Sequence, residues 1–579
     1  MMTPLQRFLQ LAWLDRASLF LLSCYATGAG LLALAVPLAA QALVNTIVQG
    51  LFLQPLLILT VAVFSGLILS GTLKAMQLAI AEGVQQRLFA RLGLRLTELI
   101  PRFDSQAFRE QKGPEDLNKF FEIVNIQKSW NKLLLDVPAS CVELLLSFGF
   151  LTLYGPTLLT LAVLASLLAG LLITLLGYGG LQSSMAESKT KYQLAGWLEQ
   201  VARSQDAWKL ADTGRHALQF SDGLIAKYLK YRQKHFSVLL RQVSTYYFFN
   251  ALVVAGLLGY GGWMVIERQI SVGQLVAIEI VVLNLLKSAE KLVRSGEAYF
   301  DLLTGLDKVG HLLETPLERA TDRKLDRKEA GCELDLRGVV FAYGERQPAL
   351  IRQLELRVPA LARFTILGRE GEGKSTLAQL MAGLLRPQRG QIEMDGIEVS
   401  RLERGGASWL HPRQELLDAS VEENIKLGRD LSNADVRWAL EMSGLSDHLP
   451  WLGAGLETEI SWAGRNLSSA QVTRLQLARA LAGRPRLLLL DHEMAALEPE
   501  ARRRVMTRLF DSSRIWTLLN FTYDCEAFAL SHRIFWLQEG ELIDLGSPVQ
   551  AVALEESPIR RHFPTLARQL SARLEEQHV

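Results

Sequence analysis

Long apolar stretches dominate the first half of the chain. A helix needs about 20 mostly apolar residues to cross a bilayer. Six stretches of about that length or longer occur, at about 19–47, 53–80, 133–153, 157–181, 246–266 and 272–293. The pattern therefore predicts an α-helical membrane domain with about six transmembrane helices, which we place at residues 1–305.

Two long polar segments, about 81–132 and 182–243, separate these stretches into pairs, and the connections within the pairs are short. The long segments are rich in Lys and Arg, whereas the short connections have almost none. Because basic loops remain on the cytoplasmic side, we expect both long segments and both termini to be cytoplasmic. Their helical periodicity predicts that the spans continue as long helices beyond the membrane.

The first 20 residues alternate apolar and charged positions and lack the cleavage site of a signal peptide. This pattern predicts a helix that lies in the membrane interface and leads into the first span. We expect no leader-processing domain before that span.

Four ionisable residues fall inside predicted spans: Lys74, Asp136, Glu143 and Glu279. Charged groups in lipid are costly and usually face a helix bundle or a cavity. One interpretation is a polar path in which Glu143 and Glu279 favour a cationic or polar cargo. The other is that these groups pair with one another or lie near the interface.

After a charged linker at 306–331, the pattern changes to alternating strands and helices over residues 332–579. A strand-like run at 363–367 leads into a glycine-rich loop, and a helix-like run at 376–384 follows it. The loop consists of Gly368, Arg369, Glu370, Gly371, Glu372, Gly373, Lys374, Ser375 and Thr376. The spacing is that of a phosphate-binding loop, and it predicts an α/β nucleotide-binding domain.

Glycines let the loop amides turn toward phosphate oxygens, and a helix N-terminus adds partial positive charge. Lys374 would reach the terminal phosphates of ATP, and Ser375 would contact Mg²⁺. Glu370 and Glu372 should weaken nucleotide binding unless they point to solvent.

Further candidate residues follow the same order along the chain. Tyr343 could stack on an adenine ring, and Gln414 could offer its amide oxygen to Mg²⁺ or water. The apolar run 486–490 ends at Asp491, a carboxylate placed to position the metal. A short motif between Gln414 and Asp491 begins at Leu467 and includes Ser468 and Gln471.

This order of motifs resembles the ATP-binding cassette (ABC) transporter family, and the six spans resemble its exporter-type half-transporters. The resemblance implies that two chains pair and hold ATP between their cassettes. Ser468 and Gln471 would then contact the nucleotide held by the other chain's phosphate loop. Helix bends near 103–111 and 208–216 would pass cassette closure to the spans, which alternate between two states.

Three departures from the family pattern indicate a degenerate ATP site. His492 stands where the family usually has the glutamate that orients the attacking water, and Tyr523 stands where it has a switch histidine. The signature, usually Leu-Ser-Gly-Gly-Gln, carries side chains at Ser469 and Ala470. Loss of a general base costs about 10²- to 10⁴-fold in rate. We therefore expect an ABC-type ATPase site that binds ATP but hydrolyses it poorly.

Three functions remain open at this point. In the leading one, the chain is the degenerate half of a heterodimeric exporter, with a competent second half-transporter. The others are a slow homodimeric exporter and a nucleotide-sensing regulatory or assembly subunit that moves no cargo. We expect a bacterial inner membrane location and lipid contacts, and a periplasmic adaptor is a further candidate partner. The net charge of +2 gives no sign of nucleic-acid binding, and the four scattered cysteines favour neither disulfides nor a zinc site.

Overall fold

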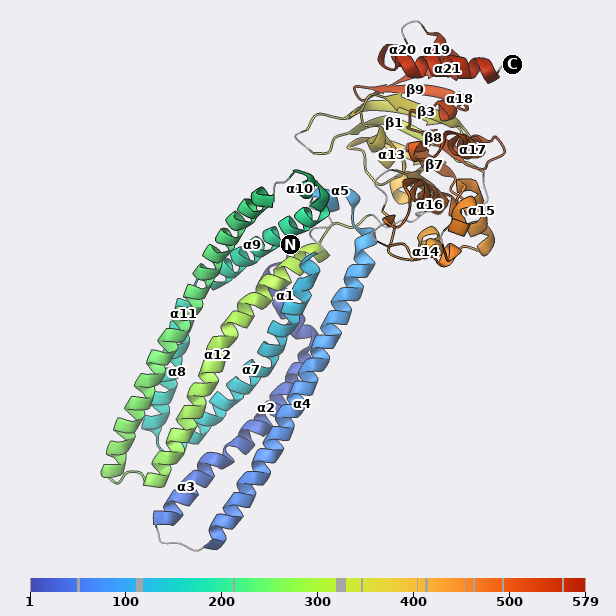
Figure 1. The fold of residues 1–579 in the computed structure, drawn as a ribbon. Coiled ribbons are helices and arrows are strands. Elements are labelled where there is room, and N and C mark those ends of the chain that lie inside the picture. Colours follow the sequence, from blue (N-terminus) through green and yellow to red (C-terminus); the bar gives the residue numbers. More distant parts are fainter. Residues whose placement is uncertain are drawn as a thin grey trace. The chain divides into compact units, whose positions relative to one another are not determined.

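The computed structural model describes residues 2–48, 53–110, 118–211, 214–318, 330–344, 347–402, 405–411, 415–451, 453–461, 464–491, 494–554 and 557–577. The chain divides into two compact units, residues 1–317 and 318–579. The first is helical and the second combines strands with helices (Figure 1).

Long helices make up the first unit. Their bounds are α1 Pro4–Leu14, α2 Arg16–Ala33, α3 Ala35–Val48, α4 Leu53–Leu99, α5 Ser105–Glu110, α7 Glu122–Thr152, α8 Pro156–Leu176, α9 Gly180–Arg203, α10 Gln205–Ala211, α11 Gly214–Ile266 and α12 Val272–Leu313. Two short 3-10 helices are η1, Ile100–Arg102, and η2, Asn118–Phe121. Helix α12 packs along α7, α2 along α4, and α11 along α9 (Figure 1).

Six apolar helical segments correspond to the predicted spans. Within the described residues, five are long and apolar enough to cross a membrane: Arg16–Ile47, Leu56–Arg102, Asn118–Thr152, Gly214–Ile266 and Val272–Leu313. Helix α8, with 21 residues, provides the remaining apolar segment. The expected extension of the spans is confirmed, because α4 has 47 residues, α11 has 53 and α12 has 42.

The carboxylate of Glu143 pairs within the helical unit. Ser288 Oγ donates a hydrogen bond of 2.5 Å to Glu143 Oε2, and Lys291 Nζ lies 3.9 Å from the same oxygen. Both partners belong to α12, whereas Glu143 belongs to α7. The partners of Glu143 are therefore not among the other three ionisable residues named above, and the contacts join α7 to α12.

Helix α12 extends to Leu313, so the first residues of the predicted linker at 306–331 are helical. Residues 319–329 of that linker lie outside the described residues. The predicted interfacial helix corresponds to α1, which exposes Leu5, Leu9 and Trp13.

The described residues of the second unit form ten strands: β1 Leu334–Phe341, β2 Ile351–Val358, β3 Arg363–Gly368, β4 Arg389–Met394, β5 Ile397–Glu398, β6 Ala407–Leu410, β7 Leu487–Leu490, β8 Thr517–Asn520, β9 Arg533–Gln538 and β10 Glu541–Gly546. Its helices are α13 Lys374–Met381, α14 Val421–Lys426, α15 Asn433–Ser443, α16 Ser469–Ala482, α17 Pro499–Phe510, α18 Cys525–Ala529, α19 Pro548–Ala553, α20 Pro558–His562 and α21 Pro564–Gln577.

Two sheets organise these strands. A four-stranded sheet has the order β2-β1-β4-β5, and a six-stranded sheet has the order β10-β9-β3-β8-β7-β6. Strands β9, β3, β8, β7 and β6 are parallel, and β10 is antiparallel to β9. Strands β3, β7 and β8 are buried along their whole length, as expected for parallel strands covered on both faces.

Candidate nucleotide-binding site

The candidate site lies at the carboxyl edge of three neighbouring parallel strands. The phosphate loop follows β3, Asp491 follows β7, and Tyr523 comes three residues after β8. Because β8 lies between β3 and β7, segments that are more than 100 residues apart in sequence end at the same edge. Open parallel sheets commonly bind ligands at this edge.

The phosphate loop has the expected strand–loop–helix context. Gly373 is the N-cap of α13 and has a φ of 98°, which is in the left-handed region that glycine tolerates. A Cβ atom at Gly368 would lie 2.5 Å from the carbonyl oxygen of Leu537, so this position has no room for a side chain. The loop therefore depends on glycine at both ends, and the N-terminus of α13 faces the space above it.

Lys374 turns back over the loop. Its Nζ atom donates hydrogen bonds to the carbonyl oxygens of Gly368 at 2.6 Å and Arg369 at 3.0 Å. It also lies 2.9 Å from Tyr523 Oη and 4.9 Å from the centre of the Tyr523 ring. The ammonium group is thus held directly at the mouth of the loop, where a phosphate would have to compete for its N–H donors.

Tyr523, the residue predicted to stand at the switch position, closes this network. Its hydroxyl also donates to the carbonyl oxygen of Gly368, and its ring packs 4.8 Å from the ring of Phe563. The resemblance placed Tyr523 where the family has a switch histidine but gave no sign of its bond with Lys374. That contact depends on the pairing of β8 with β3, and no local sequence pattern predicts which strands pair.

Glu372 points away from the loop amides. Its Oε2 atom accepts a hydrogen bond of 2.7 Å from the backbone N–H of Glu539, which begins the turn between β9 and β10. Glu370 is exposed. The expected repulsion between these carboxylates and a nucleotide is therefore reduced, since one is used to fasten the loop to the sheet and the other faces solvent.

Ser375 and Asp491 provide oxygen ligands of the kind that Mg²⁺ prefers. Burial raises the pKa of the Asp491 carboxyl, while hydrogen bonding to Ser375 and the charge of Lys374 act in the opposite direction. A half-buried carboxylate beside a hydroxyl and an ammonium is a suitable place for a divalent cation with a phosphate. These two residues fit the predicted metal, and Mg²⁺ would supply charge neutralisation between the β- and γ-phosphates.

Tyr343 lies beside the first turn of α13. Its hydroxyl is 2.9 Å from Thr376 Oγ1, and its ring meets that of Phe341 edge to face at 5.1 Å. The side chain is 39% exposed. The hydroxyl bond and the Phe341 contact fix the ring near the loop, so the stacking role predicted for Tyr343 remains a prediction with a suitable geometry.

The signature segment starts a helix. Ser468 is the N-cap of α16, and it forms a capping box with Gln471, with hydrogen bonds of 2.9 and 3.3 Å. Ser468 and Ser469 are exposed, whereas Ala470 is half-buried against the core. Of the two extra side chains in the signature, only Ser469 is thus exposed at the surface.

His492 and Gln414 lie outside the described residues, so their predicted roles in catalysis and metal binding stay predictions. Sequence reasoning also missed the fastening of the loop by Glu372. A carboxylate inside a phosphate loop was the available signal, because its presence there requires a partner other than the nucleotide.

Comparison with known proteins gives a consistent result. Residues 351–495 match the family model described as ABC transporter. The leukotoxin export ATP-binding protein LtxB of Aggregatibacter actinomycetemcomitans is 26% identical over 294 residues, which are 49% of this chain and 41% of that protein. The alpha-hemolysin translocation ATP-binding protein HlyB of Escherichia coli is 25% identical over 305 residues, 51% of this chain and 43% of that protein. The matched region thus spans less than half the length of these relatives.

The similarity in structure covers both units. A bacterial Atm1-family ABC exporter with ATP bound matches 97% of this chain and 99% of its own, with a TM-score of 0.82 and 20% sequence identity. At this identity the match shows the fold. The predicted fold class, a helical membrane domain joined to an α/β nucleotide-binding domain, is confirmed.

Proposed function

We propose that this chain, which joins an ABC transporter domain to the helical fold of an ABC exporter, is one half of an exporter that binds ATP strongly and hydrolyses it slowly. One observation carries the proposal. Lys374, Ser375 and Asp491 converge at the edge of the sheet, as ATP and Mg²⁺ require, while Tyr523 bonds to Lys374.

Binding should survive because its main parts are in place. The glycines of the loop, the N-terminus of α13 and the ammonium of Lys374 are the groups that hold a triphosphate. Each loop carbonyl that now accepts from Lys374 can return to water when the ammonium turns to a phosphate. ATP binding therefore needs a local exchange of partners rather than a new fold.

Hydrolysis should be slow because the groups that activate water differ from those of the family. At neutral pH an imidazole at position 492 lacks the full negative charge that a carboxylate would use to take a proton. A tyrosine at 523 also lacks the imidazole nitrogen with which a switch histidine could accept a proton. ATP binding then drives the change in conformation, and the slow hydrolysis of ATP returns the protein to its starting conformation.

A second chain would complete the ATP site. Ser468 and the N-terminus of α16 are exposed, which supports a role in contacting the nucleotide of a partner cassette. We propose a heterodimer in which a more competent half-transporter supplies most of the hydrolysis, in the inner membrane and with both termini cytoplasmic. A slow homodimer is the alternative, and purification of the tagged chain from its native host separates the two.

The first test is ATP binding by the purified full chain. Wild-type protein should bind Mg²⁺-ATP, and Lys374→Ala should weaken binding by about 10²-fold or more, since a charge-assisted contact with phosphate is lost. Lys426→Ala, which removes an ammonium of the same unit that pairs with Glu422, is the control. Equal affinity in Lys374→Ala and wild type would refute the assigned phosphate loop, and rapid phosphate release by wild type alone would refute the impaired site.

A further inference from the structure

A second site lies in the helical unit, at the end where α1 meets α12. A pocket of about 950 Å³ opens among η2, α9, α11 and α12. Its lining residues recur every three or four positions, at 185, 189, 192, 196 and 200 on α9 and at 304, 308 and 311 on α12. Each helix therefore turns one continuous face toward the pocket.

The charges that line the pocket are mostly positive. Four of its lining residues are lysines, namely Lys119, Lys189, Lys227 and Lys308. The one lining carboxylate among the described residues, Asp307, is engaged by Arg7 at 3.0 Å. Lys189 and Lys227 are exposed, and neither has a hydrogen-bond or ion-pair partner within the described part of the chain. Two ammonium groups thus face the pocket with their donors available.

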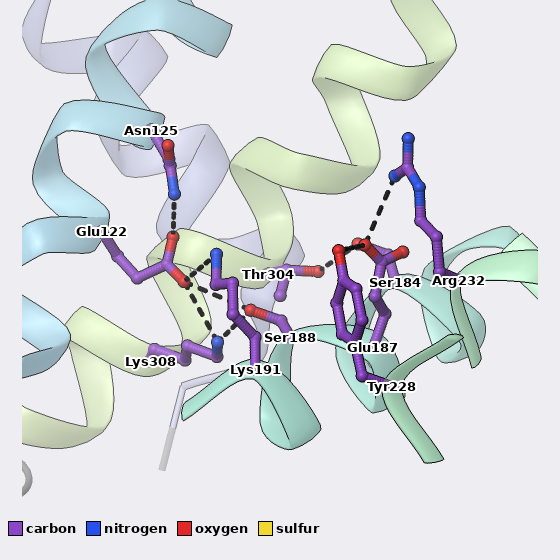
Figure 2. Close-up of polar contacts among 10 residues, drawn as sticks. All are labelled: Glu122, Asn125, Ser184, Glu187, Ser188, Lys191, Tyr228, Arg232, Thr304 and Lys308. Carbon is purple, nitrogen blue, oxygen red and sulfur yellow. Dashed lines mark hydrogen bonds and ion pairs between the residues drawn. The ribbon is translucent and has the colours of Figure 1, made fainter. Parts of the chain in front are cut away.

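Glu122 lies beside the pocket, but its charge is already neutralised (Figure 2). This carboxylate is 3% exposed, and its Oε1 atom lies 3.1 Å from Lys308 Nζ and 3.6 Å from Lys191 Nζ. Asn125 and Ser188 donate to it at 2.7 and 3.2 Å. Two ammonium groups for one carboxylate leave this cluster with a net positive charge.

Polar contacts brace the walls on both sides of α9 (Figure 2). Ser184 Oγ lies 3.1 Å from Thr304 Oγ1, which joins α9 to α12. Glu187 accepts from Arg232 at 3.3 Å and from Tyr228 at 3.4 Å, which joins α9 to α11. These contacts fix the separation of the three helices, so the pocket is a feature of the folded unit.

Part of the wall is aromatic. Trp197 and Phe220 line the pocket with their ring centres 4.3 Å apart, and Tyr192 lies 4.1 Å beneath the ammonium of Lys308. The pocket therefore combines cationic groups with apolar surface, which is the pattern that holds a molecule with an anionic end and an apolar body.

We propose that this pocket binds an organic anion whose phosphate or carboxylate groups contact Lys189 and Lys227 and whose apolar part lies against Trp197 and Phe220. The identification of this anion as cargo rests on the proposed export function, and it is made because α11 and α12 continue from the pocket into the predicted spans. A soluble anion and the headgroup of an anionic lipid share this chemistry. This proposal differs from the interpretation in which Glu143 and Glu279 favour a cationic or polar cargo.

Direct binding measurements test the pocket separately from the cassette. The purified full chain is titrated with 1-naphthyl phosphate and with neutral 1-naphthol, which differ only in the anionic group. We expect tighter binding of the phosphate, weakened by salt. Lys189→Gln/Lys227→Gln should reduce its affinity about tenfold or more, whereas Lys230→Gln/Lys234→Gln, which removes the same charge from α11 outside the pocket, should not.

The cassette is excluded as the binding site of the probe by repeating the titration in Lys374→Ala, where binding of 1-naphthyl phosphate should persist.

Bilayer nanodiscs of phosphatidylcholine, with and without phosphatidylglycerol, then identify the source of the anion. Competition by phosphatidylglycerol in wild type, absent in the Lys189/Lys227 variant, indicates a lipid headgroup, and lack of competition indicates a soluble anion. Equal affinity for the phosphate and the naphthol, or loss of binding in Lys374→Ala, would overturn the proposal. Failure of wild type to bind ATP would overturn the proposed function and leave the pocket result intact.

Discussion

At the scale of single residues, Lys374 has two competing sets of partners. In the structure its ammonium bonds to two loop carbonyls and to Tyr523 Oη. A triphosphate requires the same N–H donors, so part of the binding free energy is used to break these contacts. Hydrogen bonds that involve a charged group contribute about 1.5 to 3 kcal/mol, which makes Tyr523 a measurable competitor.

We predict that Tyr523→Phe raises the affinity for ATP by about three- to tenfold, because it removes one partner of Lys374 and keeps the ring against Phe563. Calorimetric titration of the purified chain measures the change. Tyr343→Phe is the control, since it removes a hydroxyl that bonds to Thr376 and not to Lys374. A loss of affinity in Tyr523→Phe would instead place its hydroxyl on the nucleotide.

Asp491 supports a second prediction. Burial raises the pKa of its carboxyl above the usual 3.8, so the ionised form at neutral pH carries a cost that Mg²⁺ would relieve. Asp491→Asn should leave the nucleotide-free protein as stable as wild type, or more stable by about 1 kcal/mol. It should lose most of the thermal stabilisation that Mg²⁺-ATP gives to wild type.

The sign of the pH effect follows from the raised pKa of Asp491. A carboxyl whose pKa is raised in the folded protein stabilises the folded state fully when the pH is below its ordinary pKa of 3.8. It loses that contribution as the pH rises through its pKa in the folded protein. Wild type should therefore gain stability relative to Asp491→Asn as the pH is lowered toward about 4. A constant difference in unfolding temperature between pH 7 and pH 4 would show that burial of the charge has no energetic effect.

The sequence could predict the loop and Asp491 because each belongs to a local pattern, a strand followed by a turn with its own residue types. The bond between Lys374 and Tyr523 could not be derived in this way, since 149 residues separate the two. The pocket was missed for the same reason. Glu122 and Lys308 are 186 residues apart, and the surrounding lysines were explained sufficiently by membrane topology.

At the scale of elements, one buried arginine fastens α1 to the end of α12. Arg7 is 8% exposed, and its guanidinium contacts Asp307 Oδ1 at 3.0 Å and Glu314 Oε1 at 2.9 Å. It also donates to the backbone carbonyl of Asp307 at 3.0 Å. Gly310 makes room for it, because a Cβ atom there would lie 2.2 Å from Arg7 Nε. A helix at Pro4–Leu14 was predictable from its pattern, but this attachment was not.

We predict that Arg7→Ala destabilises the helical unit by about 1 to 3 kcal/mol, since it removes a buried guanidinium that joins α1 to α12 and takes a donor from the half-buried Asp307. Gly310→Ala should act in the same direction by displacing the guanidinium. Gly296→Ala, on the same helix with no atom within 4 Å of the added methyl group, is the matched control. Thermal unfolding in detergent measures all three, and equal effects of the two glycine variants would contradict the role of Gly310.

At the scale of the whole molecule, the order of the apolar spans and the position of the α/β unit were readable because both depend on long, repeated patterns. The spans predicted at 53–80 and 246–266 are parts of α4 and α11, which are much longer. Their ends could not be located from hydropathy, since hydropathy marks where the apolar part of a helix stops, and the polar part continues with the same 3.6-residue period.

The last prediction concerns the whole cycle. If an imidazole at position 492 limits hydrolysis, His492→Glu should restore a charged base and raise phosphate release by the purified chain about 10- to 100-fold. His492→Gln, of similar size and uncharged, should give no increase, which separates a gain in basicity from a change in packing. A steady-state phosphate assay at saturating ATP measures both variants.

An unchanged rate in His492→Glu would show that Tyr523 or the exposed Ser469 of the signature limits hydrolysis instead. The double variants His492→Glu/Tyr523→His and His492→Glu/Ser469→Gly then distinguish these, because only the variant that relieves the true limit can increase the rate. In a heterodimer the same substitution should act weakly, since the partner chain already supplies most of the turnover.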